Sequence, residues 1–169
     1  FMCNGALTIG TLDGANVEMA EEAGRENIFI FGHTEKEITE LGKTYRSTEW
    51  LSRDPEMEAA IKLIQYGFFN NGEDGIFDPL LKTLLDYNDR YFLFADLRMY
   101  HDKHEEASEL YRDDKATWNR MSAINIASSA KFSSDRTIKE YADEIWHIKP
   151  CHVKKSKEDS VLEDAKKAK

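Results

Sequence analysis

Only two short segments of this chain have the composition of β-strands. Residues 28–31, Ile-Phe-Ile-Phe, are apolar without interruption, as in strands that are buried on both faces of a parallel sheet. Residues 7–9, Leu-Thr-Ile, form a shorter run that ends in Gly10. A sheet of two strands alone is marginally stable in water. We therefore expect residues 28–31 to belong to a larger sheet whose other strands lie outside this sequence.

A helix is predicted between these two strands, over residues 15–23. Its apolar residues recur at every fourth position, and Gly24 follows the last of them, where helices commonly end. Asp13 precedes the helix in a turn with Gly14 and is a candidate for the N-cap. A strand, a helix and a second strand in succession indicate a parallel, right-handed βαβ crossover.

Most of the remaining sequence predicts helices, several of which have recognisable starts. Residues 34–37, Thr-Glu-Lys-Glu, have the spacing of a capping box. Asp54 and Asp78 each precede a proline, the arrangement of an N-cap followed by proline at the first helical position. Apolar stripes further predict a long helix from about Asp96 and another around Met121.

The last predicted helix opens at Ser134-Asp135, and we expect one of these two residues to cap it. Its apolar positions follow the i, i+3, i+4, i+7 spacing of a single helix face. They are Ile138, Tyr141, Ala142 and Ile145. We expect this stripe to face the core, so that the helix acts as a structural clasp.

Composition excludes several classes of protein. The chain has 169 residues, of which 41% are hydrophobic, and a formal net charge of −9. A body this acidic repels a phosphate backbone, so we expect no nucleic-acid partner. No run approaches the roughly 20 apolar residues of a membrane helix, so we expect no membrane partner. Cys3 and Cys151 lie far apart without a CxxC motif, which favours a reducing, cytoplasmic setting.

The two ends of the sequence suggest how the chain is organised. It begins with Phe1 rather than methionine, so we expect a processed product or a segment of a longer protein. Residues 150–169 begin with a proline and contain six lysines and four acidic residues but few large aliphatic ones. We expect this tail to be flexible. The predicted division is therefore a domain portion at 1–149 and a tail at 150–169.

Gly5, Gly10 and Gly14 surround the first predicted strand. A glycine turn between a strand and a helix N-terminus can hold a phosphate group. However, the sequence lacks both GxGxxG and the GK[ST] ending of a P-loop. We therefore interpret these glycines as a tight turn that lets the helix and the strand pack closely.

Two groups of residues have the composition of metal sites. His101, His104 and Glu105 lie at helical spacing, but the run that contains them is highly charged, which is typical of a solvated helix face. His147, Cys151 and His152 are close in sequence, but Pro150 interrupts them, and no fourth ligand is evident. We expect neither group to bind a metal.

The remaining candidates for catalysis are isolated side chains. Glu18, Glu21 and Glu22 could act as paired acid and base, but they occupy the polar face of an amphipathic helix. Asp13 follows a strand end, where open α/β sheets bind ligands, although helix capping also explains it. Cys3 has no histidine nearby in sequence to activate it. The residues alone thus indicate no catalytic constellation.

Two blocks of this sequence resemble glycogen (α-1,4-glucan) phosphorylases. The first runs from Phe1 to Glu18 and continues through Ile28-Phe-Ile-Phe-Gly32. The second comprises Lys131-Phe-Ser-Ser-Asp-Arg-Thr-Ile138 with Tyr141 and Glu144-Ile-Trp146, and it is similar to the closing helix of that family. Cys3 departs from the family, which more often has an apolar residue there. The two blocks bracket nearly the whole chain.

The resemblance implies an enzyme with two Rossmann-like domains that face a catalytic cleft. Such enzymes release glucose 1-phosphate from an α-1,4-glucan by using inorganic phosphate. They carry pyridoxal 5'-phosphate on a lysine, and the phosphate of this cofactor exchanges a proton with the substrate phosphate. The resemblance places that lysine just before Phe1 and a glycine-rich phosphate-binding segment before the lysine. This chain would therefore contain no catalytic, cofactor-binding or metal-binding residue. The resemblance also implies a cytoplasmic homodimer.

The sequence thus predicts an α/β chain that is mostly helical, with a βαβ unit at its start. We expect it to be the C-terminal part of a Rossmann-like domain of a two-domain glycosyltransferase, where it completes the sheet and braces it. Its partners would be the rest of its own polypeptide and, in the full enzyme, α-1,4-glucan and phosphate. Two alternatives stay open: a stand-alone acidic helical module that binds a protein, and a nucleotide-sugar-binding half-domain that uses the Gly10–Gly14 turn.

Overall fold

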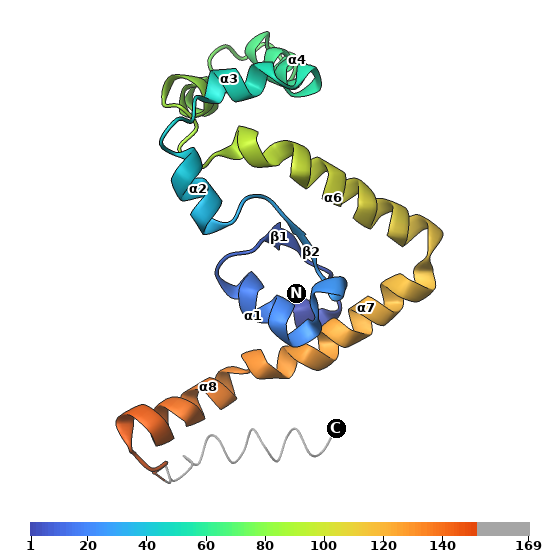
Figure 1. The fold of residues 1–169 in the computed structure, drawn as a ribbon, viewed down its shortest axis with the longest axis vertical. Helices are drawn as coiled ribbons and strands as arrows, with labels where there is room; N and C mark the ends of the chain where they lie inside the picture. The colour runs from blue at the N-terminus through green and yellow to red at the C-terminus, as the bar shows by residue number, and fades with distance from the viewer. Residues whose placement is uncertain (152–169) are drawn as a thin grey trace, which may run out of the picture. The chain divides into compact units, whose positions relative to one another are not determined.

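The computed structural model describes residues 1–151. They divide into two compact units, the first comprising residues 1–130 and the second beginning at Lys131. The described chain is mostly helical and contains a small parallel sheet of two strands (Figure 1).

The elements of the first unit include short helical turns, which carry the labels η1 to η3. In chain order they are η1 (Met2–Asn4), β1 (Ile9–Thr11), α1 (Ala15–Ala23), η2 (Arg25–Asn27), β2 (Phe29–Phe31), α2 (Glu35–Leu41), α3 (Ser47–Ser52), α4 (Pro55–Gln65), α5 (Asp78–Leu81), η3 (Lys82–Asp86), α6 (Leu93–Asp113) and α7 (Lys115–Ser128). The turn η4 (Ser129–Phe132) crosses the boundary between the units, and the second unit contains α8 (Ser134–Glu140) and η5 (Tyr141–Trp146).

The sheet confirms the parallel pairing that the sequence predicts. Ile9 of β1 lies opposite Phe29 of β2, and Thr11 lies opposite Phe31. The first strand begins two residues later than the predicted run at 7–9. Phe29 is buried, but Ile30 and Phe31 are only partly buried. A strand composed for burial on both faces therefore leaves apolar surface uncovered by the described residues.

The sheet packs on two long helices, which meet at a bend near residue 114 (Figure 1). α6 contacts both strands, and α7 contacts α1 and α6. Phe29 from the sheet, Ala107 from α6 and Met121 from α7 form the centre of this core. Leu7, Ile9, Leu110 and Trp118 surround it and are partly buried. Sheet and helices thus share a single hydrophobic cluster.

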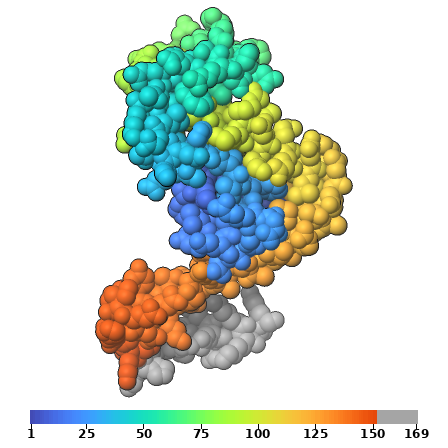
Figure 2. Space-filling view, viewed as in Figure 1, coloured from blue at the N-terminus to red at the C-terminus, as the bar shows by residue number. Residues whose placement is uncertain are grey.

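A separate helical core forms from α3, α4, η3 and the start of α6. Its buried residues are Leu51, Met57, Ile61, Leu84 and Phe94. In the space-filling view this part of the chain, coloured teal to yellow-green, forms a continuous mass (Figure 2). Because Phe94 lies in the first turn of α6, that helix belongs to both cores of the first unit.

A buried carboxylate fixes the chain just before α6. Asp89 is 2% exposed, and its Oδ2 atom accepts hydrogen bonds from the Tyr45 hydroxyl at 2.7 Å and from the Phe94 N–H at 2.9 Å. Burial and the bond to Asp89 raise the pKa of the Tyr45 hydroxyl well above its usual range. Tyr45 therefore remains a donor to this carboxylate at every physiological pH.

Two predicted helix starts are confirmed. Thr34 caps α2 in a capping box, in which its hydroxyl accepts from the Glu37 N–H and the Glu37 carboxylate accepts from the Thr34 N–H. Asp54 caps α4 and accepts from the N–H groups of Glu56 and Met57. In both cases neighbouring residues make the cap, so the local sequence contains the information needed to predict it.

Two other predicted caps are wrong. Gly14 precedes α1, and the Asp13 carboxylate instead accepts a hydrogen bond from the Thr11 hydroxyl at 2.9 Å. Asp78 is itself the first residue of α5 and makes no cap bond. Its N–H donates to the carbonyl of Gly75 at 3.1 Å. The helical turn therefore begins one residue earlier than predicted, and Phe77 occupies the N-cap position.

The expected burial of the last helix is also wrong for the described chain. Ile138, Tyr141 and Ile145 are 57%, 43% and 62% exposed. The predicted caps Ser134 and Asp135 are inside the helix, which no side chain caps. The spacing shows which residues share a face, but it does not show that another element covers that face. In addition, the chain winds as a π-helix from Tyr141 to Trp146, which breaks the i, i+3, i+4 alignment of the stripe.

The predicted flexible tail falls mostly on residues 152–169, which lie outside the described residues. No helix among residues 1–151 is long and apolar enough to cross a membrane.

Asn125 joins α7 to η2, the turn between α1 and β2. Its side chain is fully buried, and Nδ2 donates to the carbonyl of Asn27 at 2.8 Å and to the carbonyl of Met121 at 3.0 Å. Asn27 in turn donates from its own Nδ2 to the carbonyl of Ala23 at 2.8 Å. These two amides satisfy carbonyl groups that have little access to water, and they position α7 against η2.

We predict that Asn125→Ala lowers the free energy of unfolding by about 1–3 kcal/mol, because it leaves a buried carbonyl without its donor. The matched control is Asn119→Ala on the exposed part of the same helix, which should change stability by less than about 0.5 kcal/mol. Urea denaturation of the two variants measures the difference. Equal effects would show that the amide of Asn125 does not position α7.

Candidate functional site

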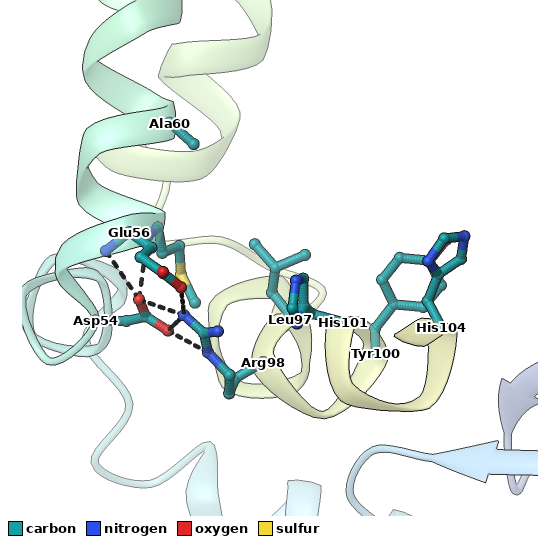
Figure 3. A pocket seen from close by; sticks show the side chains of 9 residues that line it. Asp54, Glu56, Ala60, Leu97, Arg98, Tyr100, His101 and His104 are labelled. Carbon is teal, nitrogen blue, oxygen red and sulfur yellow. Dashed lines mark hydrogen bonds and ion pairs between the residues drawn. The ribbon is translucent and has the colours of Figure 1, made fainter. Parts of the chain in front are cut away.

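A groove of about 440 Å³ lies between α4 and α6 (Figure 3). Residues from the start of α4 and from successive turns of α6 line it. They are Asp54, Glu56, Met57, Ala60, Leu97, Arg98, Tyr100, His101 and His104. The groove lies entirely within the first unit, so its geometry can be described from that unit alone.

An ion-pair network forms one end of the groove. Arg98 Nε and Nη2 donate to the two carboxylate oxygens of Asp54, each at 2.7 Å, and Nη2 also lies 2.8 Å from Glu56 Oε2 (Figure 3). The bond from Arg98 and the N–H of Met57 hold the pKa of Asp54 below its ordinary value of 3.8. The hydrogen bonds that Arg98 donates to both carboxylates raise the pKa of its guanidinium. The guanidinium is thus fully compensated, and it also links α6 to the capped start of α4.

The other end of the groove presents aromatic and imidazole side chains. Tyr100 packs edge-on against Phe31 of β2, with ring centroids 5.3 Å apart, and lies 6.0 Å from the His104 ring. His101 is exposed, and its Nδ1 lies 3.4 Å from a carboxylate oxygen of Asp102. The groove contains no buried nucleophile and no free cation. Its polar side chains therefore hold two helices together, and we assign no chemistry to them.

A second cluster of polar residues lies where the strands end. The His33 N–H donates to Asp96 Oδ1 at 3.0 Å, and His33 Nδ1 lies 2.6 Å from the same oxygen. Both side chains are largely shielded from water. Gly32 has a φ of 81°, and a Cβ atom there would meet Asp96 Oδ2 at 2.9 Å. Asp96 therefore ties the carboxyl end of β2 to the first turn of α6.

The glycines around the first strand allow close packing. Gly5 has a φ of 81°, and a Cβ atom at this position would lie 2.5 Å from Ser122 Oγ. Ser122 Oγ donates to the Gly5 carbonyl at 2.8 Å, which fixes η1 against α7. A Cβ atom at Gly10 would lie 2.5 Å from the amide nitrogen of Asn16. Gly10 lies within β1 and lets α1 approach that strand, as the interpretation requires, whereas Gly5 instead allows close approach of α7. A Cβ atom at Gly14 would meet no atom within 4 Å, so close packing is not supported at that position.

The remaining candidates from the sequence are solvated. Glu18, Glu21 and Glu22 are exposed on α1, as expected for the polar face of that helix. His101, His104 and Glu105 are exposed on α6. Cys3 and Cys151 are free and exposed thiols.

Metal binding finds no support in the described chain. His147 Nδ1 lies 2.8 Å from the Asp143 carbonyl, and His152 lies outside the described residues. Among residues 1–151, no three histidine, cysteine or acidic side chains converge as metal ligands would.

Sequence reasoning missed the contacts that organise these clusters. Arg98 and Asp54 are 44 positions apart, and His33 and Asp96 are 63 positions apart. No local pattern marks either pair. The cap at Asp54 was predictable, but its second function as an acceptor for α6 depends on the tertiary fold.

Comparison with known proteins gives the same family over nearly the whole chain. Residues 1–148 match the Carbohydrate phosphorylase family. The chain is 51% identical over 155 residues to a protein of Bos taurus named "Glycogen phosphorylase, liver form". It is 47% identical over 154 residues to a protein of Synechocystis sp. and 42% identical over 148 residues to a protein of Chlamydia pneumoniae, both named "Glycogen phosphorylase".

These matches cover most of this chain but only a small part of each relative. They include 91%, 90% and 88% of this chain but 18% of each relative. The chain thus spans less than a fifth of the length of the curated relatives that it matches.

The Arg98 network makes a prediction about the pH dependence of stability. Because the folded state lowers the pKa of Asp54, the pair stabilises the fold above the ordinary aspartate pKa and loses this effect as the pH falls below it. Arg98→Gln should therefore destabilise the protein at pH 7, and the difference from the unaltered protein should shrink between about pH 4 and pH 2.

Urea midpoints measured across this pH range test the prediction. The control is Arg112→Gln, since Arg112 forms an exposed ion pair with its neighbour Asp113 and should contribute less. A destabilisation by Arg98→Gln that is equal at pH 7 and pH 2 would mean that the charge of Asp54 is not involved.

The link from β2 to α6 makes a separate prediction. Asp96→Ala removes the acceptor of two hydrogen-bond donors on His33, so we expect the free energy of unfolding to fall by about 1–3 kcal/mol. Asp102→Ala, on an exposed turn of the same helix, should change it by less than about 0.5 kcal/mol. Thermal denaturation of both variants provides the comparison, and similar midpoints would contradict a special role for Asp96.

Proposed function

Because the chain belongs to the carbohydrate phosphorylase family, we propose that it forms the C-terminal part of a glycogen (α-glucan) phosphorylase. The observation that carries this proposal is the family match over residues 1–148 together with about 50% identity to named glycogen phosphorylases. The proposed reaction is the release of glucose 1-phosphate from an α-1,4-glucan by inorganic phosphate. The full-length protein would thus be a glycosyltransferase.

The fold supports a place for this chain in a Rossmann-like domain, which we propose to include residues 1–149. A parallel pair of strands joined through a helix is the unit from which such domains are built. The partly buried residues Ile30 and Phe31 on β2 provide apolar surface for further elements of the domain. We propose that additional strands and helices of the full-length polypeptide complete the sheet and cover it.

Pyridoxal 5'-phosphate is the cofactor implied by the family, and its phosphate would supply proton exchange with the substrate phosphate. Residues 1–24, which would follow the cofactor lysine directly, do not fit as its binding site. Residues 1–24 contain no lysine, arginine or histidine, so this segment offers neither an amine for a Schiff base nor a cation for a phosphate. We propose that the cofactor lysine precedes Phe1 in the full-length protein, and we derive no catalytic step from this chain.

The chain's own contribution is mechanical. Ser122 on α7 holds the Gly5 carbonyl at 2.8 Å, and Asn125 on the same helix holds the carbonyl of Asn27. α7 therefore positions the backbone of residues 1–5, which would continue directly from the cofactor lysine. A cytoplasmic homodimer completes the proposal.

We predict that the full-length protein produces glucose 1-phosphate from glycogen and phosphate, whereas the isolated 169-residue chain neither does so nor forms a pyridoxal Schiff base at a defined lysine. The reason is that the chain lacks a cation or amine in the segment next to the proposed cofactor lysine. A coupled assay for glucose 1-phosphate and the absorbance of the bound cofactor measure the two properties. Glucose 1-phosphate formation by the isolated chain would contradict the proposed scaffold role.

A further inference from the structure

A second cavity, of about 190 Å³, lies at the junction of α4 and α5. The loop between the two helices folds back on itself to form it, since Gly67, Asn71, Gly72 and Gly75 all have positive φ angles. Asn70 Oδ1 accepts from the Gly72 N–H at 3.0 Å and holds this turn closed. The cavity therefore belongs to a defined loop rather than to an extended linker.

The polar side chains that line this cavity are two carboxylates, two amides and one phenol hydroxyl. They come from Gln65, Tyr66, Asn70, Asp74 and Asp78. Neither aspartate forms an ion pair with a described residue, and no lysine, arginine or histidine of the described chain lines the cavity. Two uncompensated carboxylates repel anions, so a free phosphate or a phosphorylated ligand does not fit. The lining instead suits a neutral ligand that donates several hydrogen bonds.

Exposed aromatic rings stand beside these acceptors. Tyr66 lines the cavity and is 82% exposed. Phe68 and Phe69 follow it in sequence outside the cavity lining, are 70% and 57% exposed, and pack edge to face with ring centroids 4.9 Å apart. Aromatic rings that remain in water next to hydrogen-bond acceptors indicate a ligand with both an apolar face and polar edges.

A sugar ring has both properties, because its C–H groups pack on an aromatic face while its hydroxyl groups donate to carboxylates and amides. A divalent cation fits less well. Calcium requires six to eight oxygen ligands, whereas the cavity offers two carboxylates and two amides and would leave the aromatic rings without a role. The volume is suited to one sugar unit, with neighbouring units extending over the exposed rings.

We propose that the cavity at residues 65–78 binds a neutral α-1,4-glucan chain, with Tyr66 as the stacking platform and Asp74 and Asp78 as acceptors for sugar hydroxyl groups. The choice of α-1,4-glucan among neutral sugars rests on the proposed function. Binding at this loop would hold the polymer on the C-terminal part of the protein through contacts that do not involve phosphate.

Hydrogen exchange of the full-length protein tests the proposal, with maltoheptaose as the probe and phosphate left out to prevent turnover. We expect maltoheptaose to slow amide exchange in residues 66–78. Tyr66→Ala, and Asp74→Asn combined with Asp78→Asn, should each raise the concentration needed for this protection at least about fivefold. Tyr87→Ala is the matched control, because Tyr87 is 71% exposed but does not line the cavity, and it should leave the protection unchanged.

Three outcomes would overturn the proposal: no protection of residues 66–78 at saturating maltoheptaose, equal effects of Tyr66→Ala and Tyr87→Ala, or protection by calcium chloride but not by maltoheptaose. A parallel assay of the unaltered protein for glucose 1-phosphate separates this proposal from the proposed function. Glucose 1-phosphate without protection would refute the binding site alone. Protection without glucose 1-phosphate would support the site and refute the phosphorylase activity.

Discussion

The first unit depends on the packing of a single long helix, α6, against two different partners. At its start, Phe94 enters the helical core of α3, α4 and η3, while Ala107, several turns later, belongs to the core beneath the sheet. The polar contacts follow the same division. Arg98 joins α6 to the cap of α4, and Asp96 joins it to the end of β2. The positions of α4 and β2 relative to each other are thus fixed through one element.

The sheet beneath α6 has only two short strands, although the apolar sequence of β2 is typical of a strand inside a larger sheet. Its two strands have three residues each, and sheets of this size have little stability without further support. Here α6 and α7 provide the support by packing on the sheet. Asn125 of α7 also anchors that helix to the backbone at Asn27. The apolar residues that remain partly exposed on β2 give a physical reason to regard the chain as part of a larger sheet.

What the sequence predicted correctly was local. The capping box at residues 34–37, the cap at Asp54 and the parallel pairing of the two strands all depend on residues near one another or on a short crossover. The failures at Asp13 and Asp78 were also local, since neighbouring hydrogen bonds competed with the predicted caps. The stripe on the last helix failed because periodicity identifies a face without identifying what covers it. The pairs His33–Asp96 and Arg98–Asp54 could not be predicted, because only the tertiary fold brings them together.

The central claim is that the two strands form part of a larger sheet in a longer polypeptide. Amide hydrogen exchange at residues 9–11 and 29–31 tests it most directly, measured in the isolated 169-residue chain and in the full-length protein. If further strands complete the sheet, these amides should exchange slowly in the full-length protein and markedly faster in the isolated chain. Equal protection of both strands in the two proteins would contradict the claim, because it would mean that no additional strand pairs with β1 or β2.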